Sequence, residues 1–151
     1  MPVLKREASI KWLDSPPQGV PRLTVGSESF TALPLNLNLL ASHPLATSPG
    51  ELLAGAIGST FAWVAAQAFV KEGKQLKELT TNVTLTLSCT DEDGTDMALT
   101  AISCQALGRV ADVAEDRFEL VAEAAMTRCM EMLGMRTEGI TVTVEALLEG
   151  A

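Results

Sequence analysis

The chain has 151 residues, which is enough for one ordinary domain with its own hydrophobic core. Hydrophobic residues make up 47% of it, so it falls outside the disordered class, which combines low hydropathy with high charge. Its 19 acidic and 11 basic residues give a formal net charge of −8, which repels nucleic-acid phosphates and anionic membrane surfaces. We therefore expect a single domain over residues 1–151 that binds neither nucleic acid nor membrane.

The first part of the chain predicts three short strands. Apolar and polar residues alternate at the start, which is the period of a half-buried strand. Residues 14–19, with two prolines and a glycine, cannot continue a ladder. Pro34 ends the third strand, and residues 36–47 are expected to form a loop. The predicted strands span residues 4–12, 23–25 and 30–33.

A long apolar helix is predicted to begin at residues 48–51, which read Ser-Pro-Gly-Glu. The serine can accept hydrogen bonds from free amides, proline suits the first helical position, and Glu51 can close a capping box. Residues 52–70 are all uncharged, and residues 71–73 end the helix. This length also matches a membrane span. We favour a buried core helix, because small residues fill much of the run and the neighbouring segments need an apolar partner.

A hairpin, a second helix and a last strand follow. The predicted strands span residues 82–89, 97–110 and 140–146, and a turn at 91–94 joins the first two. Apolar residues spaced by three and four predict a helix that begins near Asp112 or Asp116, with Gly134 as its C-terminal cap. The order is βββ-α-ββ-α-β, an α+β fold.

The cysteine and histidine content argues against metal and disulfide sites. Cys89, Cys104 and Cys129 lie far apart in the sequence, and His43 is the only histidine. A structural zinc site needs about four nitrogen or sulfur ligands, and small secreted domains carry dense, paired cysteines. Residues 1–12 alternate charged and apolar residues, unlike the apolar core of a signal peptide. We expect a cytoplasmic protein with no cofactor, no metal and no disulfide framework.

Residues 47–62 carry the most specific motif, TSPGELLAGAIGSTFA. This motif resembles the T-[NS]-P-E-E-L-L-x-A-A-x-A-x-C-F-[AS] helix of the family of osmotically induced protein C and the organic hydroperoxide resistance proteins (OsmC/Ohr). Residues 8–12 and 24–29 are similar to the family's first two strands, and residues 122–129 to the helix that carries its second cysteine. The resemblance implies an intertwined homodimer, with long central helices packed between antiparallel sheets and active sites at the subunit interface.

The resemblance also implies thiol-dependent reduction of organic hydroperoxides, part of an oxidative stress response. In the family a reactive cysteine of the central helix attacks the peroxide, becomes a sulfenic acid and forms a disulfide with the second cysteine. A glutamate and an arginine hold the thiolate and the peroxide. In this chain Thr60 stands at the reactive-cysteine position, Gly50 at the glutamate position and Leu40 closest to the arginine position, while Cys129 matches the second cysteine.

A threonine hydroxyl is a weak nucleophile without a neighbouring base, and it cannot pass through the oxidation states of a thiol. We therefore expect an inactive peroxidase site that binds a small, largely apolar ligand at the dimer interface, such as a lipid-derived acid or hydroperoxide product. The expected ligand-binding residues are Ser59, Thr60, Trp63, Met126 and Cys129. Two alternatives stay open: a redox enzyme that uses Cys129 as its sole reactive thiol, and a structural dimer without a ligand.

Simpler interpretations compete at each position. The hydroxyl of Thr60 can bond back to the carbonyl one turn earlier, a use as well founded as a ligand contact. Glu51 is expected to serve the capping box, and His43 to be a solvated loop side chain. The positions of Cys129 and Cys89 on apolar faces favour buried, inert thiols.

Overall fold

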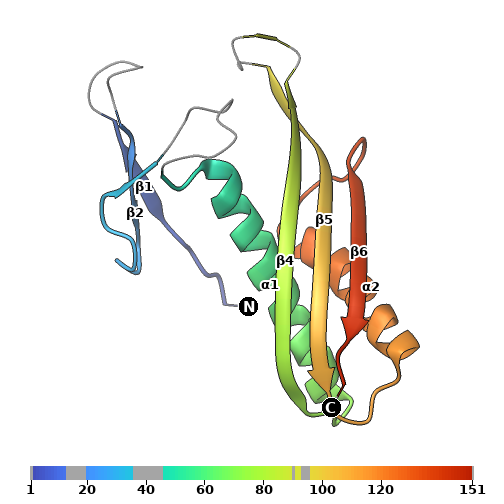
Figure 1. The fold of residues 1–151 in the computed structure, drawn as a ribbon. Coiled ribbons are helices and arrows are strands. Elements are labelled where there is room, and N and C mark those ends of the chain that lie inside the picture. The colour runs from blue at the N-terminus through green and yellow to red at the C-terminus, as the bar shows by residue number, and fades with distance from the viewer. Residues whose placement is uncertain (1, 13–19, 36–45, 90, 93–95, 151) are drawn as a thin grey trace. The chain divides into compact units, whose positions relative to one another are not determined.

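The computed structural model describes residues 2–12, 20–35, 46–89, 91–92 and 96–150. The chain forms two compact units, Met1–Leu52 and Leu53–Ala151, and each is described by itself. The predicted order of strands and helices is confirmed, as is the α+β class (Figure 1). His43 and Leu40, with the rest of residues 36–45, lie outside the described residues.

The first unit holds an antiparallel sheet of three short strands, β1 (Ala8–Lys11), β2 (Arg22–Val25) and β3 (Leu33–Pro34), in that order. The predicted third strand over residues 30–33 is wrong in position, because residues 26–32 form turns and bends in which Glu28 and Ala32 adopt positive φ angles of 61° and 53°. β1 is also shorter than predicted, and all four of its residues are exposed.

The second unit is built on a sheet with the strand order β4 (Leu76–Cys89), β5 (Met97–Val110) and β6 (Thr141–Leu148). β4 pairs with β5 in antiparallel fashion, as the predicted hairpin requires, but β5 and β6 are parallel. The expectation of antiparallel sheets is therefore wrong for this mixed sheet. The physical reason is the helix between β5 and β6, since a helical crossover returns the chain in the direction in which it left.

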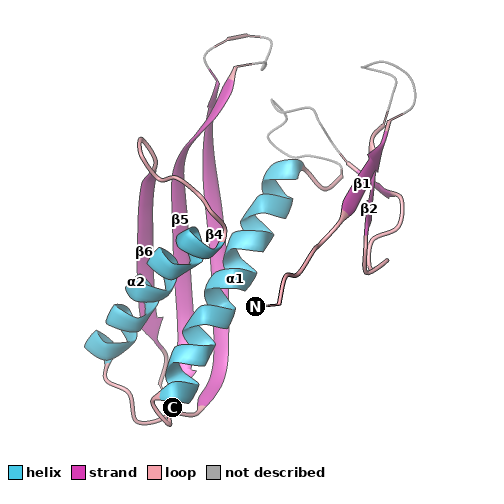
Figure 2. Cartoon of the chain, turned by 180° about the vertical axis from the view of Figure 1, so that it is seen from behind, coloured by secondary structure: helices cyan, strands magenta, loops and turns pink. Residues whose placement is uncertain are grey.

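Both helices lie on one face of this sheet (Figure 2). They are α1 (Pro49–Lys71) and α2 (Glu115–Met132). Between helices and sheet lies the core, in which the rings of Phe69 and Phe118 stack with centroids 5.7 Å apart. α2 begins after Asp112 rather than at it, because Asp112 adopts a positive φ of 57°. Gly134, with a φ of +65°, follows the helix as predicted.

The capping box that the sequence predicts at the start of α1 is confirmed. The amide of Glu51 donates to Ser48 Oγ at 3.2 Å, and the amide of Ser48 donates to Glu51 Oε1 at 3.0 Å. Two of the amides that lack a helical partner are thus satisfied by a reciprocal pair. Glu51 consequently has the structural task that the sequence assigns to it.

Among the described residues, α1 is the one helix long and apolar enough to cross a membrane. This is weak evidence for a membrane span, because a core helix of a soluble protein has the same length and composition. In one chain, 28% of its most apolar stretch is buried. The buried residues are Ile57, Gly58, Phe61, Ala65 and Phe69, which follow each other at spacings of three and four. α1 therefore packs one stripe on the sheet and leaves much apolar surface exposed.

Candidate functional site

Thr60, which the resemblance places at the reactive-cysteine position, lies at the middle of α1 and is half-buried. Its hydroxyl makes no hydrogen bond with any residue that the structure describes. The hydrogen bond back to the preceding turn is made instead by the neighbouring Ser59, whose Oγ donates to the carbonyl oxygen of Gly55 at 2.8 Å. Ser59 is exposed and occupied with the helix backbone, so Thr60 carries the more available hydroxyl of the pair.

Cys129 of α2 contacts the same part of α1. Its Sγ lies 3.5 Å from the carbonyl oxygen of Ile57, one turn before Thr60, and it interacts with the backbone amide of Phe61. The structure thus brings Cys129 against α1 one turn before Thr60. Two members of the predicted site, Thr60 and Cys129, belong to neighbouring elements of one core.

The thiols of this core are shielded from solvent and hold their protons. Cys129 is 0% exposed and Cys104, on β5, is 1% exposed. Burial raises the pKa of Cys129, and the backbone amide of Phe61 opposes that rise only in part. Burial and then the neighbouring Cys129 raise the pKa of Cys104 from 9.0 to about 11. Since the thiolate is the nucleophile in peroxide reduction, both thiols are poorly suited to it at neutral pH.

Cys89 lies near the end of β4 and is half-buried, so the expectation that it is a core residue is wrong. The physical reason is that Cys89 lies at the end of the strand, beside the hairpin turn. Its Sγ donates to the carbonyl oxygen of Asp91 at 2.8 Å and approaches Asp91 Oδ1 at 3.1 Å. The sulfur of Cys89 therefore contacts the polar turn residue Asp91.

Within one chain, three of the five expected ligand-binding residues line three different cavities, and Thr60 and Cys129 line none of these three. Ser59 borders a cavity of about 450 Å³ between α1 and β4, where the hydroxyl of Thr81 is buried without a partner among the described residues. Trp63, 57% exposed, borders one of about 410 Å³ that Met132 also lines. Met126 borders a third cavity, between α2 and β6.

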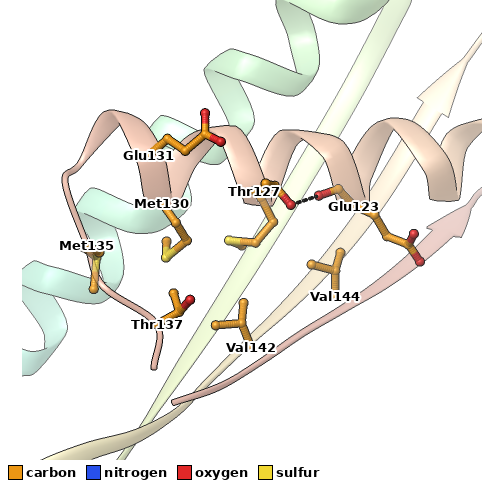
Figure 3. A pocket seen from close by; sticks show the side chains of 9 residues that line it. Glu123, Thr127, Met130, Glu131, Met135, Thr137, Val142 and Val144 are labelled. Atoms are coloured by element: carbon orange, nitrogen blue, oxygen red, sulfur yellow. Dashed lines mark hydrogen bonds between the residues drawn. The ribbon is translucent and has the colours of Figure 1, made fainter. Parts of the chain in front are cut away.

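This third cavity has a volume of about 460 Å³, and most of its lining residues were not predicted as site residues. Figure 3 shows the side chains of α2 above those of β6, with Met130 and Met135 at one end. The lining residues are Glu123, Met126, Thr127, Met130, Glu131, Met135, Thr137, Val142 and Val144. The sequence does carry a signal for it, because Met126 and Met130 are four residues apart on one helix face.

The described residues contain no group of three or more His, Cys, Asp or Glu side chains placed to hold a metal ion. Charged side chains in the second unit form pairs at the surface instead. Arg109 Nη2 lies 2.6 Å from Glu78 Oε2 across β4 and β5, and Arg117 of α2 pairs with Glu72 just after α1. These exposed pairs add little to stability.

Comparison with solved structures finds the same fold in several proteins. An OsmC-like protein of unknown function from Vibrio cholerae superposes with a TM-score of 0.73 and 12% identity, over 96% of this chain and 100% of that one. The organic hydroperoxide resistance protein OsmC of Legionella pneumophila gives 0.68 and 16%, over 99% and 100%. A putative organic hydroperoxide resistance protein from Vibrio cholerae, with captopril bound in one of its active sites, gives 0.65 and 17%, over 100% and 95%.

Sequence comparison gives a match to a family model but none to an individual curated protein. No curated protein sequence matches this chain. The family model described as OsmC-like protein does match it, over residues 42–146. That range includes both helices and the whole sheet of the second unit up to Ala146. The chain belongs to the OsmC-like protein family.

Proposed function

We propose that this protein is a cytoplasmic homodimer of the OsmC-like family that has no peroxidase activity and binds a small, largely apolar ligand. The observation that carries the proposal is the state of the thiols around Thr60. The position that matches the reactive cysteine has a hydroxyl, and the nearby Cys129 is fully buried with a raised pKa. Hydroperoxide reduction needs an accessible thiolate, which this part of the protein does not offer.

The exposed apolar surface of the helices supports a dimer. Six large hydrophobic side chains on or just after α1 and α2 are at least 38% exposed in one chain: Leu53, Trp63, Val70, Leu120, Met132 and Leu133. Large apolar side chains left exposed on neighbouring helices are typical of an interface. A second copy of the chain that covers the cavity beside Trp63 and Met132 would turn this open groove into an enclosed, mostly apolar site, which is how small-molecule sites are lined.

A relative supports the ligand half of the proposal. The putative organic hydroperoxide resistance protein from Vibrio cholerae holds captopril in one of its active sites, so a member of this fold accepts a small organic molecule there. In this chain the corresponding region has lost the reactive thiol but keeps Thr60 and the exposed Trp63 on α1. We infer that this chain retains the binding of a small organic ligand but not the peroxidase activity.

The peroxidase half is tested by turnover of cumene hydroperoxide with dithiothreitol as reductant. We expect the wild-type rate to equal that of the Cys129→Ser variant, since the buried thiol does not react. Thr60→Cys should add at most weak turnover, because the glutamate position still reads Gly50. Dithiol-dependent turnover in the wild type that Cys129→Ser abolishes would refute the proposal and favour a redox enzyme that uses Cys129.

The ligand half is tested with a single-tryptophan reporter. The chain has two tryptophans, so Trp12→Phe leaves Trp63 as the only one and Trp63→Phe leaves Trp12 as the matched control. Titration with a long-chain fatty acid should shift the Trp63 emission saturably and leave the Trp12 emission unchanged. Native mass spectrometry and sedimentation then give the bound mass and the oligomeric state. A dimer with no bound mass and no Trp63 response would instead indicate a structural role.

A further inference from the structure

We propose that the cavity between α2 and β6 is a second site that binds a small organic cation with an apolar body. This cavity lies on the side of α2 that faces β6, whereas Cys129 faces α1, so the inference does not rest on the function proposed above. Its volume of about 460 Å³ is within the usual range for small-molecule sites.

Apolar side chains line most of the middle of the cavity and its end near Met135, where Thr137 adds one hydroxyl (Figure 3). Met126 and Met130 project from α2 and are 3% and 6% exposed, and Val142 and Val144 project from β6 on the opposite side. Met135 closes the end after α2, held by a backbone hydrogen bond of 3.0 Å from its amide to the carbonyl oxygen of Met130. Flexible thioether side chains adapt to irregular apolar shapes, which suits a ring or a branched chain.

The other end is acidic. Figure 3 shows the carboxylate of Glu123 at the end of the cavity beside Val144, away from Met135. Glu123 makes no ion pair with any described residue, and its backbone carbonyl accepts a hydrogen bond of 3.3 Å from Thr127 Oγ1. The lining residues that the structure describes include two glutamates and no lysine, arginine or histidine. An apolar body with a positive group at one end therefore complements this cavity, whereas a carboxylate would be repelled.

The arginine that pairs with Glu131 does not cancel this acidic end. Arg128 Nη1 lies 3.3 Å from Glu131 Oε2, and both side chains are 61% exposed, so the pair is weak and screened. It also involves Glu131, which Figure 3 shows pointing away from Val142 and Val144, and leaves Glu123 without an ion-pair partner among the described residues. The net charge of −8 raises the local concentration of cations around the whole molecule.

The test compares three probes that share one body: 4-phenylbutylamine, 4-phenylbutanol and 4-phenylbutyrate. Protein labelled with ¹³C at the methionine methyl groups reports where each probe binds. We expect the amine to shift the methyl signals of Met126, Met130 and Met135 saturably, with Met97 and Met132 unchanged. The alcohol should bind more weakly than the amine, and the butyrate should bind weakest of the three.

A charge variant sharpens the assignment. Glu123→Gln should weaken amine binding about two- to fivefold, because a contact with an exposed carboxylate is lost, and should leave alcohol binding unchanged. Glu123→Asp should keep most of the affinity. The matched control is Glu119→Gln, which removes an exposed charge on α2 that does not line the cavity. Thermal melts of all three variants confirm that they remain folded.

Four outcomes would overturn the proposal. One is butyrate binding as tight as amine binding, and another is an amine affinity that Glu123→Gln does not change. A third is a shift at Met132 in place of Met126 and Met130, which would put the probe in the cavity beside Trp63 and support the apolar site instead. The fourth is the absence of any methionine shift at millimolar amine, as expected if a second copy covers the cavity.

Discussion

α1 and α2 lie on the same face of the same sheet, but they bury very different shares of their apolar surface. On α2 the buried residues are Phe118, Val121, Ala122, Ala125, Met126, Cys129 and Met130, while most of the other positions are polar or charged. On α1 five residues are buried, and the exposed positions include Leu53, Trp63 and Val70. α2 is an amphipathic helix that buries most of its apolar residues in one chain, with Leu120 and Met132 as exceptions, whereas α1 is apolar also on the side that one chain leaves exposed.

The apolar surface of α1 is larger than the part of it that one chain buries. A helix that is apolar all round is stable when it is surrounded by other apolar elements, and the sheet covers a single stripe of α1. The exposed apolar face of α1 would be buried by another apolar surface. A second copy of the chain carries the same exposed face, so two copies could cover each other. The predictions below test this contrast between α1 and α2, beginning with the largest expected effect.

The two faces of α1 should respond differently to truncation. Phe61 is 0% exposed, so Phe61→Ala should lower the free energy of unfolding by about 3–5 kcal/mol through lost burial and a residual cavity. Trp63→Ala, on the exposed face, should change it by about 0.5 kcal/mol or less in a monomer. Urea unfolding at two protein concentrations measures both effects.

The dependence of unfolding on protein concentration then tests whether a second copy of the chain covers Trp63. If a second copy covers Trp63, the destabilisation by Trp63→Ala should be concentration-dependent, because the variant dissociates more readily. An effect of Trp63→Ala as large as that of Phe61→Ala in the dissociated chain would contradict the burial pattern on α1. A stable, folded wild-type monomer at micromolar concentration would contradict the dimer.

Alkaline pH should weaken the core beneath the helices. The folded pKa of Cys104 is about 11 against an ordinary 9.0, so the unfolded chain loses this proton first and stability falls as the pH rises from 9 to 11. Two pKa units correspond to about 2–3 kcal/mol. The chain has no tyrosine, which keeps phenol titration out of this window. Urea midpoints between pH 7.5 and 11 should fall less steeply for Cys104→Ala than for the wild type.

Gly108 is required where β5 passes under α2. A Cβ at this position would lie 2.5 Å from two ring atoms of Phe118, and that ring is itself held by the stack with Phe69. Gly108→Ala should therefore destabilise the fold by about 1–3 kcal/mol through overpacking. Gly150→Ala, with open space around it, is the matched control. If Gly108→Ala costs nothing while Phe118 stays buried, the close approach of α2 to β5 is wrong.

More of the fold than of the candidate site could be predicted from the sequence. The capping box at Ser48 and Glu51, the period of α2 and its end at Gly134 are local signals, and each is confirmed. The positive φ angles at Glu28 and Ala32 displaced the predicted third strand, because neither residue type announces such a turn. The parallel pairing of β5 and β6 was missed, although the helix between them implies it.

The site was less predictable because it depends on which way each helix residue points. Resemblance predicted that Thr60 and Cys129 share one site, and the structure places Cys129 against Ile57, one turn before Thr60. Ser59, Trp63 and Met126 were expected in the same pocket, but they border separate cavities in one chain, since residues on different helix faces diverge. Met135 was missed because it follows the helix, where the period gives no guidance.

The smallest expected effect tests the helix starts. α1 has its capping box, whereas the N-cap of α2, Ala114, makes no side-chain hydrogen bond although its backbone has the extended conformation of a cap (φ −76°, ψ 154°). Ala114 is exposed, so serine fits there without strain and can accept a hydrogen bond from the amides of the first turn. Ala114→Ser should stabilise the protein by about 0.5–1 kcal/mol, a gain of a few degrees in Tm.

The reverse change on α1 completes this test. Ser48→Ala removes a cap that the structure does contain and should cost about 0.5–2 kcal/mol, while Ser48→Asp should restore most of it. Aspartate suits position 48 because the N-terminal end of a helix favours negative charge; at position 114, where Asp112, Glu115 and Asp116 are already close, serine is the better choice. If Ala114→Ser is neutral while Ser48→Ala is costly, the first turn of α2 already has its amides satisfied by solvent. The two helices would then differ in how much of their apolar surface is buried, and not in the stability of their first turns.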